Sequence, residues 1–169
     1  MSYRNKTYVA FASEDIRSYR LMEAWRDNAR IDFNFYDAHD LYVARDTSTP
    51  DTIKRRLRER LNNAKQVVLL ASPDAKRKGG DGVSFLAHEI KVIQELDLPL
   101  VIANINQSRV IDRGGIPNPL IDANYTSLNV SFQPKIIMYA LDRCIGFHAD
   151  HPKSKAWEYK PFVYSSLGL

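Results

Sequence analysis

The sequence predicts an α/β domain, with a mainly parallel sheet of four or five strands and helices on both of its faces. Two observations lead to this prediction. Short apolar runs alternate along the chain with segments of helical periodicity, which is the pattern of successive βαβ units. Two of these runs contain the stretches "VVLLA" and "LVIA", which are apolar on both sides, as the central strands of a parallel sheet are.

Four apolar runs are the predicted strands. The first is "TYVAFA" at 7–12. The second, "IDFNFY" at 31–36, alternates apolar and polar residues and should lie nearer an edge of the sheet. "QVVLLAS" at 66–72 and "PLVIANI" at 99–105 are apolar on both sides, so we expect them at the centre.

Helical periodicity occupies four stretches, at 14–28, 50–63, 84–97 and 132–145. The start of the first helix is marked by Ser13, whose hydroxyl can accept a hydrogen bond from a free backbone N–H. Thr49 can cap the second helix in the same way, and Pro50 then stands at its first position, where a missing N–H costs nothing. Strand and helix boundaries therefore agree.

Two glycine-containing stretches are predicted to be loops. The segment 107–131 also contains two prolines and several turn-forming residues, and we expect a long loop with a single helical turn. The segment 73–83 contains "KRKGGDG", which has neither the Walker spacing nor the G-x-G-x-x-G pattern. A mobile loop is therefore favoured there over a phosphate cradle.

The chain should form a single domain over residues 1–169, with a core at about 6–145 and a C-terminal tail at 146–169. Of its 169 residues, 44% are hydrophobic and 26% are charged, which is ordinary for a globular protein. The tail is rich in aromatic residues, and we expect it to pack on the body of the domain or on a neighbouring chain.

Charge, cysteine content and hydrophobicity exclude several classes of protein. Much of the net charge of +4 comes from arginines of the helix at 50–63, where a solvated face is favoured over a nucleic-acid-binding stripe. The single cysteine, Cys144, allows neither a disulfide framework nor a multi-cysteine metal site, and we expect it in the core. Without a signal peptide or a membrane-spanning run, the protein should be cytoplasmic and not bound to a membrane.

A carboxylate interrupts the apolar face of the helix at 84–97. Glu89 lies near the centre of an arc formed by six apolar residues, Phe85, Leu86, Ile90, Val92, Ile93 and Leu96. It could cap a neighbouring helix or pair with a buried arginine. Alternatively, burial could tune a carboxylate that faces a cleft, as it does in catalytic acids. The residues alone leave the two interpretations balanced.

Ligands of open α/β sheets bind beyond the carboxyl ends of the strands. This rule selects the loops at 12–15, 37–46 and 72–84 and the segment after residue 104. In the second of them, His39 could act as an acid or base or contact a substrate, or it could be a solvated loop residue. "HEIKV" lacks the second histidine of a zinc motif, so we expect no metal.

The order of "YVAFASED", "FYDAHD", "VVLLAS", "SFLAHEI" and "PLVIANIN" resembles the bacterial TIR-like domains of the Thoeris anti-phage defence family, over about residues 6–120. The resemblance implies a flavodoxin-like fold. Glu89 matches the family's catalytic glutamate, and Phe85 matches the aromatic residue four positions before it. That aromatic residue is usually tryptophan, so this sequence departs from the family there.

The resemblance implies cleavage of the bond between nicotinamide and ribose in NAD, which is then the substrate, with no cofactor. The ADP-ribose part would be cyclised or transferred to give a signal that acts on a separate effector protein. Such enzymes generally assemble into homo-oligomers. The implied substrate contacts are Phe11, Ala12, Ser13, Asp37, His39 and Phe85.

Two other classes of function stay open. A non-catalytic TIR-like adaptor would act through protein–protein association, and it is favoured if Glu89 pairs with a neighbouring cation. A nucleotide-binding or nucleic-acid-associated module would use the arginine-rich helix, and its binding would depend steeply on salt.

Overall fold

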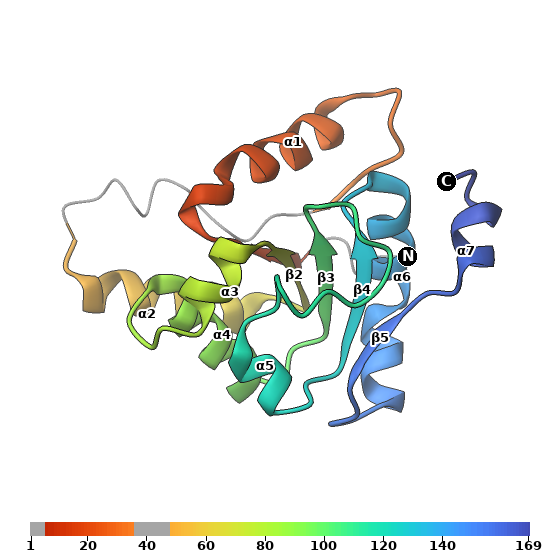
Figure 1. Ribbon diagram of the computed structural model, residues 1–169. Helices are drawn as coiled ribbons and strands as arrows, with labels where there is room; N and C mark the ends of the chain where they lie inside the picture. Colours follow the sequence, from red (N-terminus) through yellow and green to blue (C-terminus); the bar gives the residue numbers. More distant parts are fainter. Residues whose placement is uncertain (1–5, 36–47) are drawn as a thin grey trace.

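The computed structural model describes residues 6–35 and 48–169 (Figure 1). Its centre is a five-stranded sheet in which every neighbouring pair is parallel and the strands follow their order in the chain, β1-β2-β3-β4-β5. The α/β prediction is therefore confirmed. The strands are β1 (Thr7–Ala10), β2 (Gln66–Ala71), β3 (Leu100–Asn104), β4 (Ser127–Ser131) and β5 (Ala156–Glu158).

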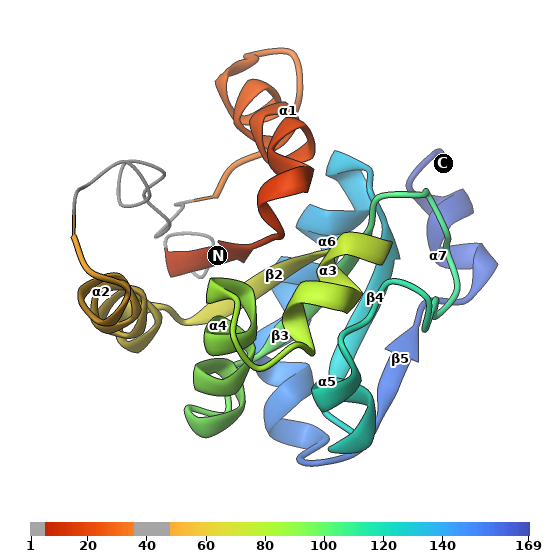
Figure 2. The ribbon, with the colours of Figure 1, turned by 60° about the vertical axis from the view of Figure 1, so that its left-hand side comes forward.

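Helices cover both faces of the sheet, with α6 on one side and α3, α4 and α5 on the other (Figures 1 and 2). The predicted helices at 14–28, 50–63, 84–97 and 132–145 are confirmed, with small shifts of their ends. The helices are η2 (Ser13–Asp15), α1 (Ile16–Asp27), α2 (Pro50–Asn63), α3 (Pro73–Gly79), α4 (Phe85–Glu95), α5 (Asn118–Asp122), α6 (Pro134–Asp150) and α7 (Pro161–Ser166).

The sheet divides the core into two layers because successive side chains of a strand point to opposite faces. Val68 and Leu70 of β2 pack in the layer formed with α1, α6 and α7. Val67 and Leu69 pack in the other layer, formed with α3, α4 and α5. Cys144 belongs to the first layer with 1% of its surface exposed, and burial raises the pKa of its thiol. The prediction of a core cysteine is confirmed.

The strand predicted at 31–36 is wrong over the part that the structure describes. Residues 31–35 form no strand there, although Phe33 and Phe35 are buried and their rings lie edge to face at 5.4 Å. Phe33 also makes an edge contact with Trp25 of α1 at the same distance. The apolar alternation of this segment therefore reflects burial of two rings and not pairing in the sheet.

A second correction concerns the long loop predicted after β3, which contains β4. The strand was missed because Ser127, Asn129 and Ser131 alternate with two apolar residues and give it a polar composition. All three polar residues are buried. The Asn129 amide donates hydrogen bonds to Ser127 Oγ and to the backbone oxygen of Trp157, both at 3.1 Å, so part of the cost of burying polar groups is offset within the fold.

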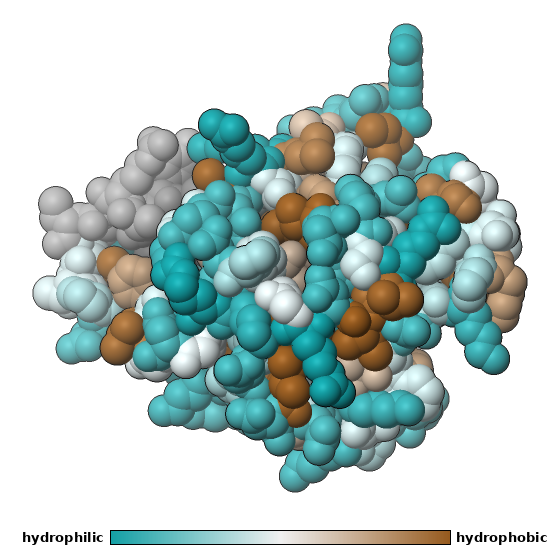
Figure 3. Space-filling model, in the orientation of Figure 1, coloured by the Kyte–Doolittle hydropathy of each residue, from teal (hydrophilic) through white to brown (hydrophobic). Residues whose placement is uncertain are grey.

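The C-terminal tail lies against the body of the domain. Tyr164 of α7 is fully buried, and its hydroxyl accepts a hydrogen bond from the backbone N–H of Ser131 at 3.1 Å. The Tyr164 ring also contacts Arg109, whose guanidinium lies 4.6 Å from the ring centre. The described helices include none that is both long and apolar enough to cross a membrane. The surface in Figure 3 is mostly hydrophilic, with separate hydrophobic spots.

Candidate functional site

Glu89 is the only buried carboxylate among the described residues, with 3% of its surface exposed. It lies on α4, and the apolar residues around it on the helix, such as Leu86, Ile90 and Ile93, are buried in the layer beside β2 and β3. The prediction that Glu89 lies within a buried apolar stripe of the helix is confirmed. Burial removes water from the carboxylate, which strengthens its interaction with any positive charge nearby.

Phe85 does not belong to this buried stripe, and that prediction is wrong. Its side chain stands at the first position of α4 and is 38% exposed. The ring is one turn before Glu89 and open to solvent, so it is available to a ligand.

The start of α4 is held by Asp81. Its carboxylate accepts hydrogen bonds from the backbone N–H groups of Val83 and Ser84 at 2.8 Å each, and also from the Ser84 hydroxyl. The bond from the Ser84 hydroxyl, followed by the two backbone bonds, lowers the pKa of Asp81. These contacts satisfy N–H groups that precede the helix and set the position from which Phe85 and Glu89 project.

The side of α4 that faces α2 is fixed by two polar contacts. His88 Nε2 lies 3.0 Å from the backbone oxygen of Lys54, and burial lowers the pKa of this imidazole, which favours a neutral ring that donates to the oxygen. At the last residue of α4, about two turns after His88, Arg58 pairs with Glu95 at 2.5 Å. Both contacts restrain rotation of the helix that carries Glu89.

The loop after β1 contains the predicted residues Phe11, Ala12 and Ser13. The Phe11 ring stacks on Tyr19 of α1 with centres 4.7 Å apart, and Ala12 is buried. Ser13 is exposed, and its hydroxyl accepts a hydrogen bond from Lys78 Nζ at 2.8 Å. This loop therefore has one fixed aromatic ring and one hydroxyl at the surface.

Lys78 and Arg77 of α3 anchor this loop electrostatically, and the sequence analysis did not identify them. Lys78 Nζ lies 3.0 Å from Glu14 Oε1, and Arg77 lies 3.3 Å from the same oxygen. The hydrogen bond from Lys78 is the largest cause that lowers the pKa of Glu14 to about 2. Glu14 therefore stays ionised over the whole physiological range of pH.

A second link joins the same loop to the end of β2. Ser72 Oγ donates to Asp15 Oδ2 at 2.5 Å and accepts from the backbone N–H of Ala75 at 3.0 Å, so it caps α3 while it binds the neighbouring loop. Burial raises the pKa of Asp15, and the charges of Asp74 and Glu14 act in the same direction. The loops after β1 and β2 thus form one hydrogen-bonded unit.

The loop predicted at 73–83 is corrected by α3, which spans Pro73–Gly79. Its start has the same signal that identified α2, namely a hydroxyl residue followed by proline and aspartate, here Ser72, Pro73 and Asp74. The glycines that follow outweighed this signal. Because α3 contacts both the loop after β1 and α4, it connects the predicted contacts at Ser13 with Glu89.

The segment after β3 is held down by Lys76 of α3. Its ammonium group donates to the backbone oxygens of Arg113 and Ile116 at 2.8 and 3.2 Å, and to Asn118 Oδ1 at 2.8 Å. Three oxygens therefore surround one cation and join α3 to the segment before α5. The carboxyl-end loops after β1, β2 and β3 are all attached to α3.

Two predicted contacts, Asp37 and His39, lie outside the described residues. The described residues contain no group of three or more His, Cys, Asp or Glu side chains arranged to hold a metal ion. Cys144 lies in the layer on the other face of the sheet from α4, so it cannot serve as a nucleophile beside Glu89. The arrangement offers a single buried carboxylate beside an exposed aromatic ring.

A comparison with known protein families shows a match. Residues 8–110 fit the family model described as the Thoeris protein ThsB, TIR-like domain. The match begins in β1, ends in the segment after β3, and includes Phe85 and Glu89. It covers more than half of the chain.

Proposed function

This chain belongs to the TIR-like domain family of the Thoeris protein ThsB, and from this premise we propose that it is an NAD-cleaving enzyme of anti-phage defence. The enzyme releases nicotinamide and converts the ADP-ribose part of NAD into a cyclic or conjugated signal. The observation that carries the proposal is Glu89, the buried carboxylate of α4, with an exposed aromatic ring one turn before it.

The proposed reaction breaks the bond between the ribose C1′ and the nicotinamide nitrogen. Nicotinamide leaves with the bonding electron pair, and the ribose develops an oxocarbenium-like positive charge. A carboxylate near the ribose stabilises that charge and accepts hydrogen bonds from the hydroxyls, as in glycoside hydrolysis. The ring nitrogen is cationic before cleavage, so nicotinamide leaves as a neutral molecule and no general acid is needed. A hydroxyl of the ADP-ribose part or of another acceptor then attacks C1′ and loses its proton.

The other residues have supporting roles in this proposal. Phe85 stacks on the substrate or restrains the Glu89 side chain from the turn before it. The loop after β1 and residues of the chain after position 35 contact the ribose and phosphates of NAD. These contacts are assigned to Phe11, Ala12, Ser13, Asp37 and His39.

The proposal includes partners. The enzyme acts in the cytoplasm as a homo-oligomer, and its product acts on a separate effector protein. Neither a membrane nor a nucleic acid takes part in the reaction, and NAD is a substrate and not a cofactor.

The test is to incubate concentrated protein with NAD, with and without lysate from phage-infected cells, and to identify nicotinamide and ADP-ribose products by mass spectrometry. Glu89→Gln should abolish release of nicotinamide. Glu59→Gln, which changes an exposed carboxylate of α2, should leave the rate unchanged. Release of nicotinamide by Glu89→Gln at the rate of the unchanged protein would contradict the catalytic role and favour an adaptor that acts by association.

A further inference from the structure

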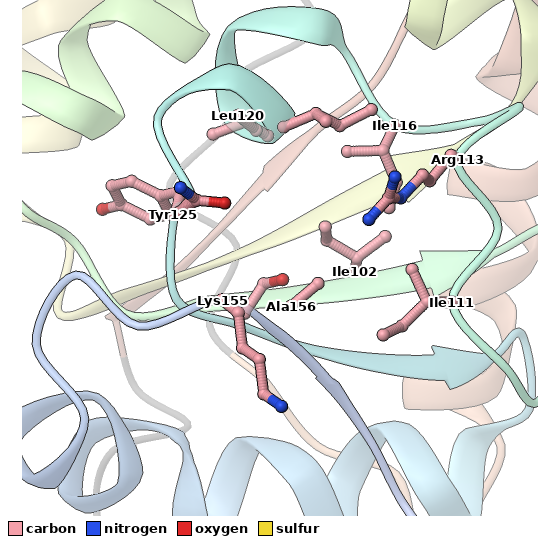
Figure 4. Close-up of a pocket in the computed structure, with 11 residues that line it drawn as sticks. Ile102, Ile111, Arg113, Ile116, Leu120, Tyr125, Lys155 and Ala156 are labelled. Carbon is pink, nitrogen blue, oxygen red and sulfur yellow. The ribbon is translucent and has the colours of Figure 1, made fainter.

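A pocket of about 240 Å³ lies on the face of the sheet that carries α4 and α5, and Glu89 is not among the residues that line it (Figure 4). Ile102 of β3 lies on one side of it, Ala156 of β5 on another, and Leu120 of α5 faces both. No residue of α4 lines this pocket. Its contents would therefore not compete with a ligand at Glu89.

The walls of the pocket are partly apolar and partly polar, and the space is large enough for a ring system. Four isoleucines and a leucine line it, namely Ile102, Ile111, Ile116, Ile121 and Leu120. An apolar cavity of about 150 Å³ is known to hold benzene, so a pocket of this size suits one or two fused rings. The lining also includes Asn124, Tyr125, Ser127 and Lys155, so polar groups stand beside the apolar ones, as they do in small-molecule sites.

One buried hydroxyl in the pocket has a hydrogen to donate. Ser127 is 3% exposed, and its Oγ accepts a hydrogen bond from Asn129 Nδ2 at 3.1 Å. Within residues 6–35 and 48–169, this hydroxyl donates to no other group. A buried hydroxyl is stabilised when its hydrogen is donated to an acceptor. Ser127 therefore favours a ligand that offers an oxygen acceptor.

One of the residues that line the pocket is a cation, Arg113. The Arg113 guanidinium lies between Ile116 and Ile102 in Figure 4, and no carboxylate of the described residues pairs with it. Its backbone is held by the bond from Lys76, so the side chain projects from a fixed point. Neither aspartate nor glutamate is among the pocket residues. The charge of the site therefore favours an anion.

The second basic residue at the rim, Lys155, is directed elsewhere. Its ammonium group lies 4.6 Å from the centre of the Trp157 ring, and Figure 4 shows it pointing away from the isoleucines. Arg113 is thus the cation best placed to meet a bound anion.

We propose that this pocket binds a small carboxylic acid with an apolar body of one or two rings. Its carboxylate pairs with Arg113, its rings lie among the isoleucines, and a further oxygen accepts the hydrogen of Ser127. The site is separate from the proposed NAD site, and nothing in this inference depends on catalysis.

NMR of protein with isotope-labelled isoleucine methyl groups tests the proposal, because four isoleucines line the pocket. The unmodified chain is titrated with 6-hydroxy-2-naphthoate and, in parallel, with the neutral 6-hydroxy-2-naphthalenemethanol. The acid should shift the methyl signals of Ile102, Ile111, Ile116 and Ile121 in a saturable manner at millimolar concentration. The signals of Ile136 and Ile137, on the other face of the sheet, should not move.

Three variants separate the contributions. Arg113→Gln should weaken binding of the acid about three- to tenfold and leave the alcohol unaffected, since only the charge-assisted pair is lost. Ser127→Ala should weaken both probes about two- to fivefold. Arg20 is an exposed residue of α1, on the other face of the sheet, and Arg20→Gln should change the affinity for neither probe.

Two results would overturn the proposal. One is the absence of saturable shifts in the four pocket isoleucines, with signals spread over both faces or not moving at all. The other is equal affinity of the acid for Arg113→Gln and for the unchanged protein, which would remove the anion preference.

Discussion

Replacing Glu89 separates two accounts of why this carboxylate is buried. Keeping a carboxylate in an apolar layer costs stability, because desolvation disfavours its charged form. Glu89→Gln keeps the shape of the side chain and removes the charge. If the carboxylate serves chemistry, thermal unfolding should show an unchanged or slightly higher Tm together with lost NAD turnover.

The structural account of Glu89 predicts the reverse. Removing one partner of a buried ion pair strands the other and typically costs about 3–5 kcal/mol. A clearly lower Tm with unchanged turnover in Glu89→Gln would therefore favour a structural pair. Urea unfolding of the same variant would give the size of the loss.

Phe85→Ala should lower turnover more than it lowers stability. Truncating a fully buried phenylalanine to alanine lowers the free energy of unfolding by about 3–5 kcal/mol. Phe85 is 38% exposed, so the loss of stability in Phe85→Ala should be smaller. Its ring is one turn before Glu89, where side chains four residues apart are neighbours. Steady-state turnover and Tm would be measured for Phe85→Ala and the milder Phe85→Leu. Wild-type turnover in both variants would exclude a role in the site.

Lys78→Met should make the protein less sensitive to acid. The folded pKa of Glu14 is about 2, against an ordinary 4.5, so its contribution to stability is present above pH 4.5 and is lost as pH falls toward 2. Without Lys78 the pKa of Glu14 should return toward 4.5. Tm would be measured for Lys78→Met and for the unchanged protein from pH 6 to pH 2. The two Tm values should differ most near pH 6 and converge near pH 2.

Glu14→Gln is the control for this titration. It removes the ionisable group itself, so its Tm should follow the flatter pH profile of Lys78→Met. A profile for Lys78→Met that stays parallel to wild type down to pH 2 would mean that the contact with Glu14 contributes nothing to acid stability.

At the scale of elements, α3 and the segment before α5 are packed closely through Gly79. A Cβ at this position would lie 2.5 Å from Pro117 Cγ, which no real contact allows, whereas a Cβ at Gly146 in α6 would meet nothing within 4 Å. Gly146→Ala should stabilise its helix by about 0.5–1 kcal/mol. Gly79→Ala should destabilise the protein by about 1–3 kcal/mol through overpacking. Chemical denaturation of both variants checks these opposite signs.

A stabilising or neutral effect of Gly79→Ala would show that Pro117 can move aside at little cost. Gly146→Ala is the control for the gain in helix propensity, because Gly79 and Gly146 both belong to helices. The sign of the difference between the two variants is therefore the quantity to compare.

Elements with one apolar side and a clear cap were predictable from the sequence, and elements whose polar groups are satisfied in space were not. α2 has the cap Thr49 and the buried row Ile53, Leu57 and Leu61, so its periodicity and boundary agree. β4 buries Ser127 and Asn129 against each other, which no pattern along the chain reveals. Polar alternation normally indicates a solvated face.

The candidate site was predictable to a similar degree. Glu89 could be identified because a charge on an apolar helix face is visible in the sequence. Lys78 and Ser72 could not, because their importance comes from contacts with Ser13 and Asp15, more than fifty positions away in the chain. Such links depend on how the strand ends meet in space.

At the scale of the whole molecule, the proposed activity should depend on self-association. The exposed hydrophobic side chains include Val83 just before α4, Phe85 at the first position of α4 and Phe162 of α7, and a second copy could cover them. Turnover per molecule should therefore rise with protein concentration. Light scattering and NAD turnover would be measured over one dilution series. Specific activity that stays flat across a change in oligomeric state would contradict this prediction.

The ammonium group of Lys76, surrounded by three oxygens, also bears on the chemical reactivity of the protein. An acylating reagent is attacked by the lone pair of a neutral amine, so an ammonium group that donates to three oxygens must leave those contacts and lose a proton before it can react. Lys91, whose side chain is 74% exposed, has only a long ion pair, with Glu95 at 3.9 Å. Limited acetylation followed by peptide mass spectrometry should therefore modify Lys91 early and Lys76 last, and the delay at Lys76 would report how rarely the segment before α5 detaches from α3.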